Sequence, residues 1–391
     1  MKASQNILSG TGSRIKRLRR LKRVNRGNYL LTGSTIVRQL EPVLIARMQL
    51  RRIFSPFVCV FITYFAITVC ITSLLLILSD SSLATWAGVD ARRFHDMAAT
   101  IIQGLTPYVD YVDPKPPLLY AVVAGMDLLA PAGSIDLFVI AGLNVVSALL
   151  IWDLGRKEYG QVAGFAAGLF FLVTSVFVQG YFFFAEQFAL VFILLAIRTG
   201  LASRYAAAGC CIGLACGFKQ YAFLGLIPLA YLVWSGNSRK YLHLFLPVIG
   251  VIAGIFGCFA LIYGPDAALS AVHWSFGIAP QYAAGIIPDV PDYHATTAIG
   301  FAINILAGIA VTLPALVFAG MSITVRGIRS RFEWAVTIAL AVFLATLFVR
   351  QYLHYWILAL PFLSLLACRE FGVRQMKDMD EFNFDTSRRK T

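Results

Sequence analysis

The sequence predicts an all-α protein: a polytopic bundle of transmembrane helices with an amphipathic helix and a re-entrant or interfacial segment in its first outer loop. Hydrophobic residues make up 59% of the 391 residues and charged residues 14%, whereas a soluble domain carries about 25% charged residues. The apolar residues form runs of roughly the length that crosses about 30 Å of hydrocarbon. These runs are continuous rather than alternating, which favours helices over a β-barrel.

About ten of these runs fit transmembrane helices. A further apolar stretch, 117–131, is 15 residues long, contains Asp127 and is bracketed by prolines, so we place it at the membrane interface rather than across the membrane. The predicted spans are 54–79, 135–153, 161–179, 183–199, 204–218, 220–234, 241–263, 297–325, 332–348 and 352–368.

Positive charge is concentrated near the N-terminus. Of the 33 Lys and Arg residues, 13 lie in residues 1–53, where Glu41 is the one acidic residue. Nucleic-acid binding is one interpretation of such a segment. We favour a cytoplasmic arm attracted to anionic lipids, and we expect no nucleic-acid partner. The apolar core of a cleavable signal peptide does not occur before residue 54.

The short basic loops give the expected orientation. With the arm inside and 117–131 not crossing, the basic loops at 155–157, 198–204, 238–240 and 326–331 all lie on the cytoplasmic side, as the positive-inside rule requires. We therefore expect an integral membrane protein, in the plasma or inner membrane, with both termini cytoplasmic. The predicted parts are the basic arm 1–53, a transmembrane domain 54–368 with outer loops at 80–134 and 264–296, and a cytoplasmic tail 369–391.

Polar residues gather at the opposite, outer ends of the spans. Ionisable groups at membrane depth are costly and usually face a bundle interior or a cavity. Five separate hairpins supply them, so we predict one shared polar site on the outer face. The candidates are Asp90, Arg93, Asp96, Asp110, Lys115, Glu186, Lys219, Gln220, Arg350 and His354.

The first outer loop carries the most informative pattern. Apolar residues at helical spacing predict an amphipathic helix over 91–103 that Gly104 ends. Asp90 stands where an N-cap belongs, and capping is compatible with a role as general base because a capping carboxylate stays ionised. Three prolines then surround Lys115 and exclude a helix. This segment fits either a stiff loop with a snorkelling lysine or a rigid loop that presents a phosphate ligand.

These residues resemble a known family. The first outer loop contains three motifs: Asp90-x-x-Arg93-Phe94, Gly104-x-x-Pro107-Tyr108-x-Asp110 and Lys115-Pro116-Pro117-Leu118-x-Tyr120. Together they resemble the first outer loop of GT-C glycosyltransferases. The most similar branch is that of the dolichyl-phosphate-mannose–protein mannosyltransferases and aminoarabinose transferases. The resemblance extends over about residues 54–368. Further similarity lies in Glu186, in Gly213-Leu214-Ala215-x-Gly217-Phe218-Lys219-Gln220 and in Tyr352-x-His354-Tyr355 with Pro361. In contrast to the tandem acids common in the family, Asp90 is followed by Ala91.

The resemblance implies an inverting transfer of a sugar from a polyprenyl-phosphate donor to a hydroxyl of a protein, lipid or glycan on the outer face. It implies Asp90 as the general base, with Asp96 in reserve. Phosphate is a good leaving group, so a second carboxylic acid is dispensable. The expected donor-phosphate ligands are Lys115, Lys219 and Arg350, and the expected substrate-positioning residues are Arg93, Asp110, Glu186, Gln220 and His354.

The sequence leaves other readings open. We expect no metal or other cofactor, although a divalent metal held by histidines and acids of the outer loops is an alternative; these residues are His273, His294, His354, Asp289 and Asp292. A nucleotide-sugar donor is disfavoured because no glycine-rich nucleotide cradle occurs. The alternative functions are a transporter or lipid-linked-sugar flippase, which would place its charges near the membrane midplane, and a non-catalytic scaffold.

Overall fold

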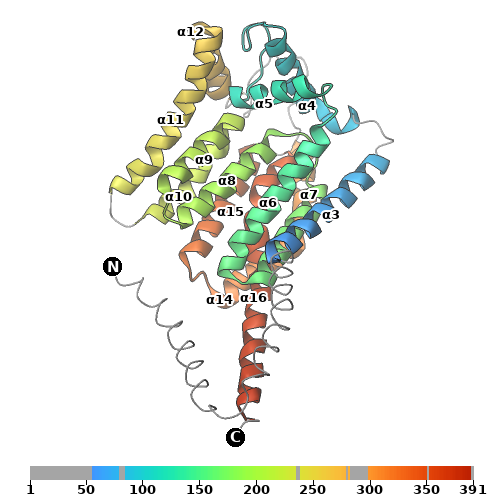
Figure 1. Cartoon of the computed structure of the whole chain (residues 1–391), viewed down its shortest axis with the longest axis vertical. Helices are drawn as coiled ribbons and strands as arrows, with labels where there is room; N and C mark the ends of the chain where they lie inside the picture. The colour runs from blue at the N-terminus through green and yellow to red at the C-terminus, as the bar shows by residue number, and fades with distance from the viewer. Residues whose placement is uncertain are drawn as a thin grey trace, which may run out of the picture. The chain divides into compact units, whose positions relative to one another are not determined.

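The structure, a computed structural model, describes residues 55–78, 84–234, 238–278, 281, 298–349 and 352–388 (Figure 1). The chain divides into two compact units, Met1–Cys59 and Val60–Thr391. The predicted basic arm lies outside the described residues, and the described part of the first unit is residues 55–59. In the described residues the secondary structure is helical apart from an isolated bridge between Pro107 and Tyr111. This confirms the predicted all-α class.

Each predicted span coincides with a helix. The elements are α3 (Pro56–Leu78), α4 (Ala84–Ile102), α5 (Pro117–Leu129), α6 (Asp136–Glu158), α7 (Gln161–Phe177), α8 (Ala185–Leu201), α9 (Tyr205–Phe218), η1 (Gln220–Gly225), α10 (Leu226–Val233), α11 (Ser238–Tyr263), α12 (Pro265–Val272), η2 (His273–Ile278), α14 (Ala298–Arg326), α15 (Arg331–Val349), η3 (Leu353–Tyr355) and α16 (Trp356–Arg388).

Length and composition divide these helices into two groups. Among the described residues, six helices are long and apolar enough to cross a membrane: Pro56–Ile77, Asp136–Glu158, Ser238–Tyr263, Ala302–Arg326, Arg331–Phe348 and Leu353–Gly372. The other four predicted spans fall on shorter helices, namely α7, α8, α9 and η1 with α10. The ambiguous stretch 117–131 contains α5, which has 13 residues. A helix of that length rises about 20 Å, which is short of the hydrocarbon thickness.

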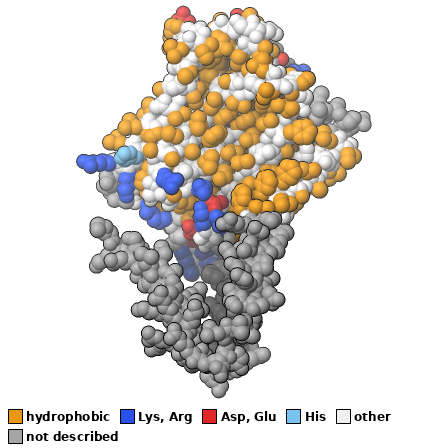
Figure 2. Space-filling view, in the orientation of Figure 1, with side chains coloured by type: hydrophobic (Ala, Val, Ile, Leu, Met, Phe, Trp, Pro, Cys, Tyr) orange, Lys and Arg blue, Asp and Glu red, His pale blue; other side chains and the backbone are white. Residues whose placement is uncertain are grey.

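Basic residues collect at one end of the helices, as the predicted alternation of crossings requires. Arg156 and Lys157 lie in the last turn of α6, Arg198 in the last turn of α8, and Arg326 in the last turn of α14. On the face seen in Figure 2, Lys and Arg side chains lie at this end, which we call the basic end, and apolar side chains cover the middle of the helices. Leu261 on α11 is 88% exposed, as expected on a helix that is long and apolar enough to cross a membrane.

The first-loop helix begins earlier than the sequence predicts. The expectation that Asp90 caps a helix starting at residue 91 is wrong, because α4 starts at Ala84 and Asp90 lies inside it. The helix continues through Gly88, since one glycine costs only about 1 kcal/mol in a helix interior. Its C-terminus is as predicted: Gly104 has a φ of 73°. The amide of Leu105 donates to the Thr100 carbonyl at 3.0 Å and that of Gly104 donates to the Ile101 carbonyl at 3.2 Å, which is a Schellman motif.

Three glycines bring α9 against α11. Gly209, Gly213 and Gly217 are spaced four residues apart and therefore share one face of the helix. A Cβ atom on Gly209 would lie 2.2 Å from the Leu244 carbonyl oxygen, and one on Gly213 would lie 2.7 Å from Val251 Cβ. Real Cβ atoms do not approach other atoms this closely, so only glycine allows this packing. Lys219 follows directly after α9, and its position depends on this contact.

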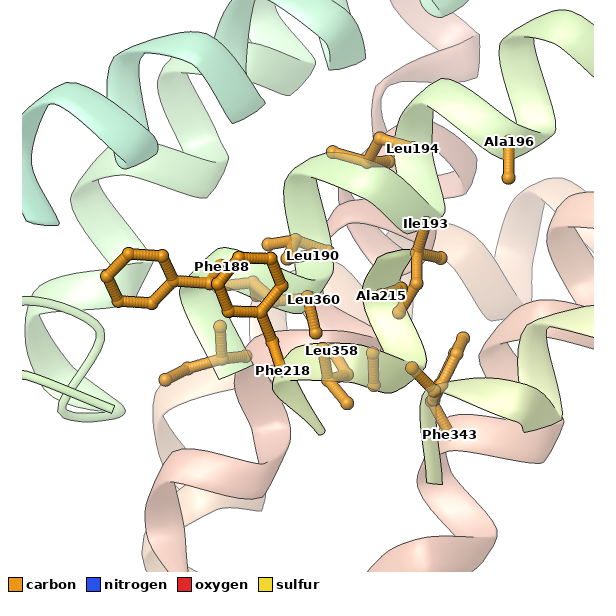
Figure 3. Packing of buried hydrophobic residues seen from close by; sticks show 14 of the residues in the cluster. Phe188, Leu190, Ile193, Leu194, Ala196, Ala215, Phe218, Phe343, Leu358 and Leu360 are labelled. Atoms are coloured by element: carbon orange, nitrogen blue, oxygen red, sulfur yellow. The ribbon is translucent and has the colours of Figure 1, made fainter. Parts of the chain in front are cut away.

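An apolar core lies beside the polar residues of α8 and α9. Phe188 on α8 stacks on Phe218 at the end of α9, with ring centroids 5.3 Å apart. Ile193 and Leu190 from α8 and Leu360 from α16 are fully buried in the same cluster (Figure 3). This core fixes the ends of α8 and α9, at which Glu186 and Lys219 lie.

Candidate functional site

Five described elements bring polar groups to the end of the helices opposite the basic end, which we call the site end. They are α4, the segment before α5, the start of α8, the end of α9 and η3. Asp90 lies on α4, and its side chain is 28% exposed. The apolar face of α4, with Phe94, Met97 and Ala98, is fully buried. Burial of this face explains how a short surface helix holds Asp90 in place.

Hydrogen bonds fix the backbone around Lys115. The Lys115 carbonyl accepts a hydrogen bond from the Tyr108 hydroxyl at 2.6 Å and from the Ser275 hydroxyl at 3.3 Å. The side-chain amide of Gln220 donates to the Pro114 carbonyl at 2.9 Å. Pro116 is extended, with φ −70° and ψ 156°. The proline-rich segment is therefore rigid, as its sequence predicts, and Gln220 is one of the residues that holds it.

The Lys115 ammonium lies between two carboxylates. Its Nζ is 3.9 Å from Asp90 Oδ2 and 3.6 Å from Asp113 Oδ1, and it lies over the Phe94 ring at 5.3 Å from the centroid. Asp113 is buried and also accepts hydrogen bonds from the Tyr120 hydroxyl and the Lys115 amide. Asp113 Oδ2 is buried without a hydrogen-bond partner among the described residues. The side chain of Asp113 thus orients Lys115 and Tyr120 together.

A second ion pair lies between the start of α8 and the end of α9. Lys219 Nζ is 2.7 Å from Glu186 Oε1, with the two side chains 4% and 1% exposed. The Tyr221 hydroxyl donates to the same oxygen at 2.9 Å. His354 Nε2 lies 3.8 Å from it, and the His354 ring stacks on Phe184 at 4.0 Å. Lys219 and Glu186 therefore form a buried ion pair, in which removal of one partner would leave the other without compensation.

Electrostatic interactions connect the two ion pairs. Burial raises the pKa of Asp90, but the positive charges of Lys115, Lys219 and Arg93 outweigh burial and hold its pKa below the ordinary value. Asp90 is therefore ionised at neutral pH, the state that a proton acceptor needs.

Other candidates of the first loop are not members of these two ion pairs. Asp96 is exposed, and one of its oxygens accepts a hydrogen bond from the Tyr111 hydroxyl at 3.4 Å. Asp110 is exposed and accepts the Thr106 amide at 2.7 Å, which closes a local turn. Arg93 is half-buried on α4. Arg350, together with the possible metal ligands Asp289, Asp292 and His294, lies outside the described residues.

Sequence reasoning missed three residues of the site. Asp113 contacts Lys115, Tyr221 donates a hydrogen bond to Glu186, and Tyr120 donates one to Asp113. Asp113 had a recognisable signal, because an aspartate two residues before a lysine often accepts the backbone amide of that lysine. No group of three His, Cys, Asp or Glu side chains converges as a metal site in the described part of the chain.

Comparison with known proteins supports the family resemblance. The family model of dolichyl-phosphate-mannose-protein mannosyltransferases matches residues 114–263. This match confirms the resemblance predicted from the sequence. It contains Lys115, Glu186 and Lys219, and it excludes Asp90 and His354. No curated protein and no solved structure matches the chain. The match and the apolar helices support a membrane glycosyltransferase of the GT-C type.

Proposed function

We propose that the chain transfers a sugar from a polyprenyl-phosphate donor to a hydroxyl acceptor, and that the transfer takes place at the site end. One observation carries the proposal: the Asp90 carboxylate lies 3.9 Å from the Lys115 ammonium. A transferase of this kind needs a proton acceptor and a cation next to each other, because a proton leaves the acceptor while negative charge grows on the phosphate. The match to the mannosyltransferase family supports the same chemistry.

The proposed reaction is a single inverting displacement. The acceptor hydroxyl attacks the anomeric carbon of the sugar, and Asp90 takes its proton. As the new carbon–oxygen bond forms, the bond between the anomeric carbon and the phosphate oxygen breaks, and its electron pair leaves with the polyprenyl phosphate. The phosphate needs no protonation to leave, so one carboxylate is sufficient. Asp96 is the reserve base, although its exposed position makes Asp90 the better candidate.

The charge balance assigns different roles to the cations. In the two ion pairs, Lys115 and Lys219 face the carboxylates of Asp90, Asp113 and Glu186. Binding of an anionic phosphate therefore needs further positive charge. We propose that Arg350 supplies it as a bidentate ligand, with Lys115 as the second ligand. Lys219, which is paired with Glu186, attracts the phosphate from a longer distance.

The remaining candidates position the substrates. We propose that Glu186 accepts a hydrogen bond from a sugar or acceptor hydroxyl, since its Oε2 is buried without a partner in the described residues. His354 lies beside Glu186 and would contact the same substrate. Gln220 acts by donating a hydrogen bond to the Pro114 carbonyl, next to Lys115. We propose that Arg93 and Asp110, from the first loop, contact the donor. Phosphate and hydroxyl groups are the ligands that these residues bind, so we propose no metal or other cofactor.

The basic end favours one orientation of the protein. Because basic loops remain on the cytoplasmic side, we propose that the basic end faces the cytoplasm and the site end faces outward, in the cell membrane. A flippase is the competing function. It would place its charged groups near the membrane midplane, whereas the two ion pairs here lie at the ends of α8 and α9 and before α5.

A reconstituted assay separates a transferase from a flippase. Purified protein in liposomes is given a polyprenyl-phosphate sugar and a panel of peptide, glycan and lipid acceptors. A transferase releases polyprenyl phosphate in amounts equal to the glycosylated acceptor, and mass spectrometry detects both products. Movement of intact donor across the bilayer without cleavage, with each acceptor unmodified, would refute the proposal.

A further inference from the structure

His95 joins three elements of the site end. It lies on α4, and its Nδ1 is 2.9 Å from Asp127 Oδ2 on α5, while its Nε2 is 2.8 Å from Asp136 Oδ2 at the start of α6. The three side chains are between 8% and 12% exposed. Phe183, in the segment between α7 and α8, stacks on the imidazole ring at 5.9 Å.

The connection between α5 and α6 is built for this contact. Gly133 has a φ of 78°, a conformation that glycine adopts without strain. The amide of Ser134 donates to the Pro131 carbonyl at 2.9 Å, which closes the turn that brings Asp127 and Asp136 to the same ring. Asp136 also lies in the first turn of α6, where the helix dipole favours a carboxylate.

The geometry requires an extra proton at this ring. An ionised carboxylate only accepts hydrogen bonds, and a neutral imidazole has one N–H and one acceptor nitrogen. Each of the two carboxylate oxygens therefore receives a hydrogen bond only when the ring is an imidazolium, which has an N–H on both nitrogens. Burial lowers the pKa of His95, but the hydrogen bonds and charges of Asp136 and Asp127 outweigh burial and raise it to about 9. Within the described residues, these two carboxylates are the charged groups that act on the ring.

We propose that His95 is a positioning residue: as an imidazolium between two carboxylates, it fixes α4 against α5 and α6 and so sets the distance between Asp90 and Lys115. Asp90 lies on α4 five residues before His95, and Lys115 lies just before α5. The imidazolium joins α4 to α5 and α6, and the Asp90–Lys115 contact joins α4 to the segment just before α5. The consequence for transfer rests on the proposed function; the charged bridge itself does not.

The bridge gives the site end an upper pH limit. The pKa of His95 in the folded protein, about 9, exceeds the value of about 6.5 for an unfolded histidine. The stabilisation is therefore complete below about pH 6.5 and disappears as the pH rises through 9. Above that pH a neutral ring faces two carboxylates and satisfies only one of them, and α4 is expected to loosen from α5 and α6.

Histidine NMR tests the bridge without any assay of transfer. The chain has five histidines, and ¹³C labelling of their rings resolves each titration. We expect one resonance with a midpoint near 9 that His95→Gln removes and His243→Gln leaves in place, since His243 is exposed at the start of α11. Asp136→Asn should lower this midpoint by about 1 to 2 pH units. A His95 midpoint at or below 7, or one that Asp136→Asn does not move, would overturn the bridge.

The pH profile of sugar transfer tests the positioning role. At pH 7, His95→Gln should lower kcat by about 100-fold, as a displacement near 1 Å costs, with a smaller change in the KM for the donor. The ratio of wild-type to variant kcat should fall as the pH rises from 7 to 10, because only the wild type has the proton to lose. A ratio that stays constant, or a kcat within twofold of the wild type at pH 7, would overturn the role.

Asp90→Asn distinguishes the two possible failures. If transfer is lost in Asp90→Asn but His95→Gln behaves like the wild type, the positioning role is wrong and the proposed function stands. If the wild-type protein cleaves no donor, the proposed function fails, and if Asp90→Asn transfers sugar normally, Asp90 is not the base. In both cases the NMR titration alone decides whether the imidazolium bridge exists.

Discussion

Lys115 Nζ lies 3.9 Å from Asp90 Oδ2, and this contact joins α4 to the proline-rich segment before α5. The ammonium lowers the pKa of Asp90 and keeps its carboxylate ionised. In the proposed reaction the same ammonium lies close to the departing phosphate. The two roles depend on one geometry, so changes to Lys115 should alter both the pH dependence and the rate.

Lys115→Met should move the acid limb of transfer to higher pH. Transfer requires ionised Asp90, so activity is lost as the pH falls through its pKa. Removal of the Lys115 charge raises that pKa, because Lys115 is the strongest of the cations that lower it. The measurement is kcat from pH 4 to pH 8 for the wild type and Lys115→Met. Arg198→Met, which removes a cation paired with Asp153 at the basic end, is the control. An acid limb at the same pH in all three proteins would contradict this account of Asp90.

The Glu186–Lys219 pair should stabilise the folded protein strongly only as an intact pair. Removal of one partner leaves a buried charge without compensation, which costs about 3–5 kcal/mol. We expect that cost for Glu186→Gln and for Lys219→Met separately, and clearly less than their sum for the double variant. Chemical unfolding in mixed micelles measures the free energies of unfolding.

The matched control for this pair is Lys157→Met. Lys157 also lies 2.7 Å from a carboxylate, that of Asp153, but its side chain is 49% exposed. Exposed pairs contribute at most about 1 kcal/mol. Equal losses of stability in Lys157→Met and Lys219→Met would show that the burial of the site pair has no energetic consequence.

Gly213→Ala should destabilise the contact between α9 and α11. The added Cβ would lie 2.7 Å from Val251 Cβ and 3.1 Å from the Val248 carbonyl oxygen, and such overpacking costs about 1–3 kcal/mol. Gly250→Ala, on α11, meets no atom within 4 Å and should be neutral or stabilising by up to about 1 kcal/mol. Thermal unfolding of the two variants in detergent gives the comparison, and a Gly213→Ala variant as stable as Gly250→Ala would be inconsistent with close packing here.

Hydropathy and charge predicted most of the fold. A helix lies at every span that the apolar runs predict, and the stretch 117–131 contains only the 13-residue helix α5. The start of α4 was misplaced because the charged residues after Asp90 begin the visible amphipathic pattern, whereas the helix itself starts at Ala84. Helix ends depend on tertiary packing as well as local sequence.

The site was predictable as a set of residues but not as a set of contacts. The structure brings Asp90 to Lys115, and Lys219 and His354 to Glu186, all of which the sequence placed in one predicted site. The sequence did not predict that Lys219 would be held by Glu186 at 2.7 Å, because the contact depends on how α8 packs against α9. His95 shows the same limit: its two carboxylate partners are 32 and 41 residues away in the sequence, and only the fold brings them together.

The most direct test of the account compares transfer and donor binding in Asp90→Asn. Asparagine has nearly the same shape but does not accept a proton at neutral pH, and general-base catalysis contributes about 10²- to 10⁴-fold. We predict a loss of transfer of that size in the reconstituted protein, with the donor dissociation constant within about threefold of the wild-type value. Transfer at the wild-type rate by a correctly folded Asp90→Asn protein would contradict the central claim that Asp90 accepts the proton of the acceptor.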